Sequence, residues 1–228
     1  MDCGRSAFPL KERNANRIVG GWEANPHSIP WQVYIEIINF PDFFFCGGSI
    51  IQLKPACFYL YQSSYSSREM TRIAPHAVSV ISGVHNIKEA IENSKKHHYL
   101  YTPILYTNYS RPICLPEVNS SLPEHNCWIS GWGYSKSSSN GSGHKTTDSN
   151  NVVKELCIDK FVLIIRKSIK SNRYFYNKLK TNVQGDSGGP FFCRNNNIYT
   201  LYGLASFNPP FAAPGTLISK VLKRLILL

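Results

Sequence analysis

A serine flanked by glycines, in the run from Gln184 to Cys193, is the sequence feature that most constrains the fold. At its centre the chain reads Gly185-Asp186-Ser187-Gly188-Gly189-Pro190. Glycines on both sides let the backbone bend so that several N–H groups point at one spot. That spot can hold a negatively charged oxygen within reach of the serine hydroxyl. The run predicts a turn built around a nucleophilic serine; taken alone, an ordinary glycine-rich turn is the alternative.

Further segments occur in an order that resembles the trypsin-like serine proteases. They correspond to an activation site, the first core strand, the strand before the catalytic histidine, the segment that bonds the propeptide, and the strand that enters the second barrel. In that order they are Arg17-Ile18-Val19-Gly20-Gly21, Pro30-Trp31-Gln32-Val33, Cys46-Gly47-Gly48-Ser49-Ile50-Ile51, Arg111-Pro112-Ile113-Cys114-Leu115-Pro116 and Cys127-Trp128-Ile129-Ser130-Gly131-Trp132-Gly133. The resemblance covers roughly residues 3–133 and 184–220, whereas 134–183 matches poorly.

Short runs of β-forming residues predict an all-β fold. Residues 31–38 and 198–204 are such runs, and turn clusters at Asn25-Pro26 and Asn208-Pro209-Pro210 punctuate the chain. The resemblance, rather than this pattern, implies two six-stranded β-barrels with a short C-terminal helix and damaged segments. It also divides the chain into a propeptide remnant, residues 1–17, and a trypsin-like protease domain, residues 18–228.

Seven cysteines indicate an oxidising compartment, with a cytosolic protein holding buried thiols as the alternative. The resemblance implies a free Cys157 and three disulfides, Cys3–Cys114, Cys46–Cys57 and Cys127–Cys193. N-glycosylation triplets begin at Asn108, Asn119 and Asn140, which agrees with secretion, although such triplets also arise by chance. We therefore expect an extracellular glycoprotein.

The first residues, Met1-Asp2-Cys3-Gly4, contain no export signal, and no apolar run is long enough to span a membrane. A secreted-type domain without a signal peptide is expected to be the C-terminal part of a longer precursor. The chain would then be secreted, or shed from a membrane-anchored protein.

The formal net charge of +11 is partly concentrated in residues 151–180. The only acidic residues in this segment are Glu155 and Asp159. It contains eight basic residues: Lys154, Lys160, Arg166, Lys167, Lys170, Arg173, Lys178 and Lys180. A basic face can bind heparin-like polyanions or acidic membranes, and a solvated loop is the alternative. No nucleic-acid-binding motif accompanies the charge. Neither a cofactor nor a metal ion is expected.

The resemblance implies a zymogen that a trypsin-like protease activates by cleaving the Arg17–Ile18 bond. The freed ammonium group of Ile18 would pair with the carboxylate of Asp186. Because an unpaired buried carboxylate is costly, this pairing can order the neighbouring loops. An exposed basic site that is cleaved incidentally is the alternative.

The catalytic residues implied by the resemblance are incomplete. Ser187 holds the nucleophile position, and the N–H groups of Gly185 and Ser187 would form the oxyanion hole. The histidine expected before Cys57 is absent, because the chain there reads Gln52-Leu53-Lys54-Pro55-Ala56-Cys57. The aspartate expected before the 111–116 segment is also absent, since no Asp occurs between Asp42 and Asp148. His97-His98 adjoins the lost aspartate segment and is the least implausible replacement base.

The specificity pocket also departs from the family pattern. Its expected residues are Thr181, Gln184, Ser206, Phe207 and Asn208. Thr181 stands at the pocket base, where a carboxylate would select Arg or Lys substrates, and its hydroxyl cannot do so.

Three functions remain open at this stage. The first is a serine-endopeptidase-like domain that has lost catalysis, a pseudoenzyme. The second is an active secreted endopeptidase, cutting peptides or proteins, whose sequence lacks short exon pieces. The third is a basic, non-catalytic module that binds polyanions or proteins.

Overall fold

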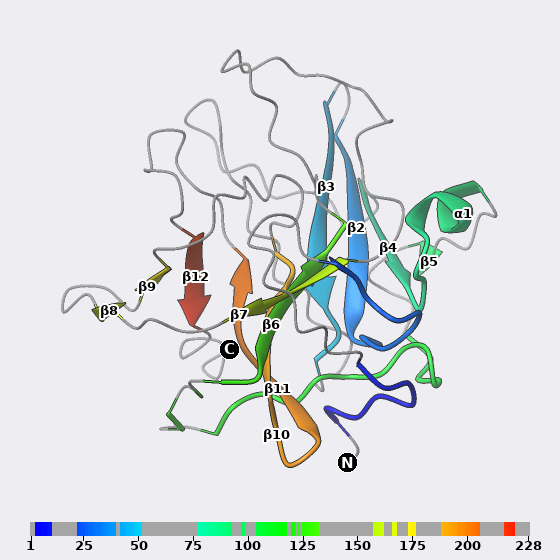
Figure 1. Ribbon diagram of the computed structural model, residues 1–228. Coiled ribbons are helices and arrows are strands. Elements are labelled where there is room, and N and C mark those ends of the chain that lie inside the picture. The colour runs from blue at the N-terminus through cyan, green and yellow to red at the C-terminus, as the bar shows by residue number, and fades with distance from the viewer. Residues whose placement is uncertain are drawn as a thin grey trace.

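The computed structural model describes residues 3–10, 22–39, 42–51, 77–92, 97–98, 104–117, 120–121, 123, 125–132, 157–161, 166–167, 173–176, 188–205 and 217–221. Two antiparallel sheets make up most of this part of the chain (Figure 1). No helix in the described ranges is long and apolar enough to cross a membrane.

The first sheet has four strands in the order β3-β2-β4-β5. Their bounds are β2 Gln32–Asn39, β3 Asp42–Ser49, β4 Val78–Ser82 and β5 His97–His98. Alternate residues of β2 face opposite sides, as a strand requires. Val33, Ile35 and Ile37 enter one apolar cluster with Val78 and Val80 of β4, whereas Tyr34 belongs to a second cluster.

The second sheet has eight strands in the order β1-β7-β6-β10-β11-β12-β9-β8. Their bounds are β1 Trp22–Glu23, β6 Cys127–Gly131, β7 Cys157–Phe161, β8 Arg166–Lys167, β9 Arg173–Tyr176, β10 Pro190–Asn195, β11 Ile198–Ala205 and β12 Leu217–Val221. Figure 1 shows β6, β10 and β11 beside the first sheet, with β12, β9 and β8 farther from it.

The β10–β11 hairpin has a two-residue turn that consists of two asparagines. Asn196 and Asn197 both have positive φ, at 47° and 62°. Two successive positive φ angles match the hand of the turn to the twist of the strands, and asparagine tolerates them well. Asn195 consequently pairs with Ile198 across the turn.

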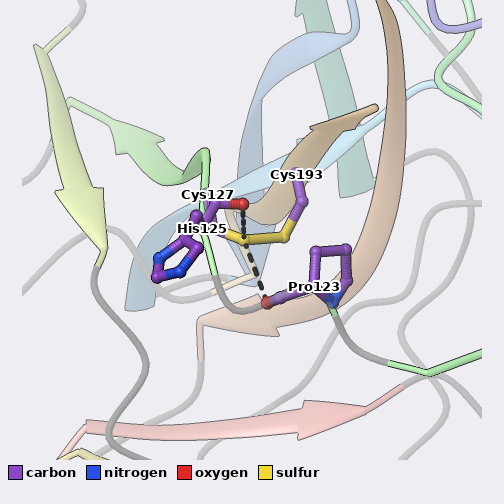
Figure 2. The surroundings of a disulfide bond; sticks show 4 residues. All are labelled: Pro123, His125, Cys127 and Cys193. Atoms are coloured by element: carbon purple, nitrogen blue, oxygen red, sulfur yellow. Dashed lines mark hydrogen bonds between the residues drawn. A yellow bond between two sulfur atoms is a disulfide. The ribbon is translucent and has the colours of Figure 1, made fainter. Parts of the chain in front are cut away.

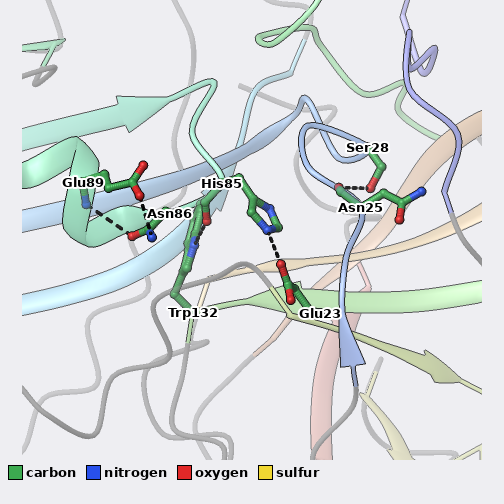
Figure 3. Close-up of polar contacts among 7 residues, drawn as sticks. All are labelled: Glu23, Asn25, Ser28, His85, Asn86, Glu89 and Trp132. Carbon is green, nitrogen blue, oxygen red and sulfur yellow. Dashed lines mark hydrogen bonds and ion pairs between the residues drawn. The ribbon is translucent and has the colours of Figure 1, made fainter.

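One short helix, α1 Ile87–Glu92, follows β4. Asn86 caps it, because its Oδ1 accepts hydrogen bonds from the N–H groups of Lys88 and Glu89, at 3.1 and 3.2 Å. The Asn86 amide donates in turn to the carboxylate of Glu89 (Figure 3). The two bonds to Oδ1 satisfy N–H groups that the first turn of a helix leaves without partners.

Aromatic rings join the two sheets in one core. Trp31, the residue before β2, lies 5.3 Å from the Phe192 ring and 5.0 Å from the Tyr199 ring, between centroids. Trp128 of β6 stacks on Phe192 at 5.9 Å. Trp31, Trp128 and Phe192 are all fully buried. The core that supports residues 188–190 therefore draws on both sheets.

The predicted all-β class is confirmed. The strands of the described residues divide into four and eight, whereas the resemblance implied six and six. Residues 52–76, between β3 and β4, lie outside the described ranges, as do residues 222–228. The described segment nearest the C-terminus is the strand β12, and the expected short C-terminal helix is not among the described elements.

Candidate active site

The turn that follows the nucleophile position is the part of the site that the structure describes. Gly188, Gly189 and Pro190 are buried, whereas residues 184–187 lie outside the described ranges. Gly188 has a φ of 86°, a conformation that favours glycine. A side chain there would also meet the backbone carbonyl of Gly47. The glycine that the sequence places after Ser187 is thus required twice, by conformation and by space.

This turn lies against the backbone of β3. A Cβ atom added to Gly47 would come within 2.8 Å of the Gly189 Cα and 2.9 Å of its nitrogen. The contact is with the strand after which the resemblance expects the catalytic histidine. Two glycine-rich segments more than 100 residues apart in the sequence therefore meet where the resemblance expects nucleophile and base to lie close together.

Cys46 adjoins this contact and has a free thiol within the described part of the chain. Burial raises its pKa to about 12, because the thiolate would lose its hydration. Cys57, its expected partner, lies outside the described ranges, so the expected Cys46–Cys57 bond is not among the disulfides described.

The described residues form two disulfides, and both are pairs that the resemblance implies. Cys127 of β6 bonds Cys193 of β10, with Cα atoms 4.0 Å apart at paired positions of adjacent strands. Figure 2 shows the bond with the Pro123 and His125 segment beside it. The Cys127 sulfur lies 3.6 Å from the Pro123 oxygen and 3.4 Å from the His125 oxygen. A disulfide sulfur has no hydrogen to donate, so these are close contacts only.

The second disulfide, Cys3–Cys114, holds the N-terminal segment 3–10 against the domain. The Gly4 N–H donates to the Pro112 carbonyl, and the Tyr199 N–H donates to the Gly4 carbonyl, both at 2.8 Å. The Asn25 amide donates to the Pro9 carbonyl at 3.1 Å. Hydrogen bonds as well as the disulfide therefore hold this segment. Arg17 and Ile18, the expected cleavage site, lie outside the described ranges.

Two described histidine side chains, those of His27 and His85, contact residues outside the turn at Gly188, and His125 is exposed. His85 Nε2 lies 2.9 Å from the Glu23 carboxylate, and the His85 carbonyl accepts a hydrogen bond from the Trp132 indole at 3.0 Å (Figure 3). His27 packs edge-on against Tyr109, with ring centroids 4.7 Å apart. Burial, and secondarily the nearby His85, lowers the pKa of His27. The backbone of His97 and His98 forms β5, paired with β4.

Most of the remaining candidate residues lie in parts of the chain that the structure does not describe. Outside the described ranges lie Arg17, Ile18, Cys57, Asn119, Asn140, Thr181, Gln184, Gly185, Asp186, Ser187, Ser206, Phe207 and Asn208. Cys157 begins β7, where it pairs with Glu23 of β1. Asn108 is exposed. Of the basic segment 151–180, the structure describes only the strands β7, β8 and β9.

Sequence reasoning did not find the polar contact that links the two sheets near this site. The Ser130 hydroxyl of β6 donates to the Gln32 side-chain oxygen of β2 at 2.6 Å. Both residues are buried, with exposed fractions of 1% and 2%. The only signal was that each polar residue interrupts an otherwise apolar strand segment.

Comparison with known proteins decides the family. The family model for trypsin matches residues 75–222, more than half of the chain. The chain belongs to the trypsin family of serine proteases. It is also 26% identical, over 228 aligned residues, to an ovochymase from Halocynthia roretzi. That alignment covers 90% of this chain but 14% of the ovochymase, so the chain spans a small part of that relative's length.

Proposed function

We propose that this trypsin-family domain no longer catalyses proteolysis. The observation that carries the proposal is the sequence that follows β3. The contact between Gly47 and Gly189 supports a nucleophile turn at its normal place, beside that strand. The six residues after Ile51 contain no histidine, and the chain has no Asp from residue 43 to 147. Ser187 would therefore be a nucleophile without a base.

The missing base is expected to lower the turnover of a serine protease by a large factor. A serine hydroxyl is a weak nucleophile at neutral pH and needs an adjacent base to take its proton. Removing the serine or the histidine of such a triad lowers turnover about a million-fold, or roughly 8–9 kcal/mol of barrier. An oxyanion hole and substrate binding alone leave about 10³–10⁴-fold over water. That remainder is too small for useful proteolysis.

His27, His85, His97 and His98 are poorly placed to replace the missing base. His85 contacts Glu23 and Trp132, and His27 packs between Phe8 and Tyr109. The strand containing His97 and His98 is at the edge of the first sheet, beside β4, whereas the turn at Gly188 lies against β3 at the opposite edge. A replacement base on β5 would have to reach across β4 and β2.

A second candidate function is an active endopeptidase whose sequence lacks short exon pieces. It is favoured by three retained residues of the activation step: Arg17, Ile18 and Asp186. A protein that is never activated would not need them. Sequencing the transcript across codons 46–57 and 97–105 separates the two candidates. In-frame codons for a histidine in the first range and an aspartate in the second would restore the enzyme.

We further propose that residues 1–17 are a propeptide that stays attached after cleavage at Arg17 by a trypsin-like protease. The Cys3–Cys114 bond supports this, because it joins Cys3, before the cleavage site, to Cys114, in the domain that follows the site. The two disulfides also favour an extracellular location.

A fluorophosphonate probe tests the loss of catalysis, since it labels serines that a neighbouring base has activated. The full chain is cleaved at Arg17, the new Ile18 terminus is verified by N-terminal sequencing, and the probe is added. Labelling at the level of a matched Ser187→Ala control is expected. Stoichiometric labelling that this substitution removes would overturn the proposal.

A further inference from the structure

Three apolar side chains in one loop are strongly exposed. Leu105, Tyr106 and Tyr109 have exposed fractions of 80%, 56% and 48%, and they are the large apolar residues most open to solvent in the described part of the chain. We call these three side chains the apolar patch. Large exposed apolar surfaces mark interaction sites, and three such side chains within five residues make this loop a candidate for one.

The loop that presents the apolar patch is built rigidly. The Thr107 N–H donates to the Ser110 carbonyl at 2.9 Å, and the Thr107 hydroxyl oxygen accepts from the N–H groups of Tyr109 and Ser110, at 3.1 and 3.2 Å. The loop is also fastened to the domain, because the Ser110 hydroxyl donates to the Ser82 hydroxyl and the Arg111 N–H donates to the Pro30 carbonyl. The backbone that carries the exposed side chains is therefore held in place.

Asn108 lies between Tyr106 and Tyr109 in the sequence and begins the triplet Asn108-Tyr109-Ser110. Its side-chain oxygen accepts a hydrogen bond of 2.5 Å from the Arg111 guanidinium, which also donates to the Thr107 carbonyl at 3.1 Å. This leaves the amide nitrogen, the atom that N-glycosylation modifies, without a hydrogen-bond partner among the described residues. Asn108 itself is exposed.

We propose that Asn108 carries an N-linked glycan and that this glycan covers the apolar patch. In the modification, the Asn108 amide nitrogen forms a bond to the first sugar carbon of a lipid-diphosphate-linked oligosaccharide. The sugar–phosphate bond breaks, the amide loses one proton, and the lipid diphosphate leaves. The C–H faces of the first sugars can then pack on Tyr106 and Tyr109, while their hydroxyl groups face water. The proposal rests on the extracellular location proposed above and is independent of the catalytic state.

A glycan fits these observations better than a second copy of the chain or a docked domain. A protein partner seated on Tyr106 and Tyr109 would have to bury the polar Asn108 amide between them, and a buried unpaired amide is costly. A glycan uses that same nitrogen as its attachment point. It is also bulky and solubilising, which is what an exposed apolar loop requires.

Modification of Asn108 is tested first by translating the full chain, behind an added export signal, with endoplasmic-reticulum microsomes. Asn119→Gln and Asn140→Gln leave Asn108 as the single triplet. One glycosidase-sensitive band shift is expected; it should be lost in Asn108→Gln and kept in Ser110→Thr, which preserves both triplet and hydroxyl. Absence of the shift, while an acceptor triplet appended to the C-terminus is modified, would overturn the proposal.

Coverage of the apolar patch is tested by limited chymotrypsin digestion of the same material, released from the microsomes in mild detergent. Cleavage after Tyr106 and Tyr109 should be slow in the glycosylated chain and fast in Asn108→Gln, with equal cleavage at sites elsewhere. Equal cleavage after these tyrosines in both proteins would refute the coverage. This readout separates the proposal from the loss of catalysis, because Ser187→Ala should behave like the parent chain.

Discussion

The buried hydrogen bond between Ser130 and Gln32 offers the sharpest test of how the two sheets are joined. It links β6 of the second sheet to β2 of the first, over 98 residues of sequence. The Gln32 amide nitrogen donates weakly to the Val33 carbonyl, at 3.3 Å. Substituting Ser130→Ala would remove the described donor to the Gln32 oxygen and leave that oxygen buried without a partner.

The expected cost follows from burial. A buried acceptor that loses its partner costs about 1–3 kcal/mol in the free energy of unfolding. For a domain of roughly this size, 1 kcal/mol corresponds to about 2–4 °C in Tm. Ser130→Ala should therefore lower Tm by about 2–12 °C. Replacing both partners by apolar groups removes the unpaired oxygen, so Ser130→Ala with Gln32→Met should cost less than the two single changes added together.

Thermal unfolding, which gives Tm, and urea unfolding, which gives the free energy of unfolding, are both followed by tryptophan fluorescence for all four corners of this cycle. Ser120→Ala is the matched control, because the Ser120 side chain makes no hydrogen bond within the described ranges, and it should leave Tm unchanged. A Ser130→Ala protein as stable as the parent chain, or strictly additive single changes, would show that this bond does not join the sheets.

Three further predictions concern the site and its surroundings. Gly188→Ala should destabilise the domain by at least about 1–2 kcal/mol, from the positive φ alone. In urea unfolding, Gly188→Asn should lower the free energy of unfolding at least as much as Gly188→Ala, because any Cβ meets the Gly47 carbonyl. A smaller loss in Gly188→Asn would argue against that clash. The Cys46 thiol, with a pKa of about 12, should react with iodoacetamide at pH 8 only after denaturation, and fast labelling of the native chain would contradict its burial. Since burial lowers the pKa of His27, the unfolded state binds the proton more readily, so stability should fall as pH drops through 6.5. His27→Asn, which tolerates the positive φ of 61°, should flatten a plot of Tm against pH between 5 and 7, and an unchanged slope would rule His27 out as its cause.

Local patterns in the sequence predicted the strands that the structure describes best. The apolar and β-branched runs at 31–38 and 198–204 correspond to β2 and β11, because side chains that alternate across a sheet leave their period in the sequence. The glycines after Ser187 predicted a bend, and Gly188 has the expected positive φ. The Cys127–Cys193 pair came from the resemblance, and paired positions on β6 and β10 explain it geometrically.

Contacts between distant segments could not be predicted in the same way. Nothing near Gln32 in the sequence indicates that Ser130 is its partner. The two residues are 98 positions apart, and the packing of Trp31, Trp128 and Phe192 brings their strands together. The exposure of the loop around Asn108 was equally hidden, since Leu105 and Tyr106 have the composition of a core segment. Sequence gives residue types and local periods, whereas burial depends on how the sheets meet.

The central claim is that this trypsin-family domain has a nucleophile turn but no base to activate it. Hydrolysis of a pooled peptide-substrate library by the Arg17-cleaved chain, compared with the same preparation of Ser187→Ala, tests it most directly. We predict turnover by the two proteins that cannot be distinguished. Turnover by the parent chain that exceeds the Ser187→Ala protein by several orders of magnitude would contradict the account and require a base at this site.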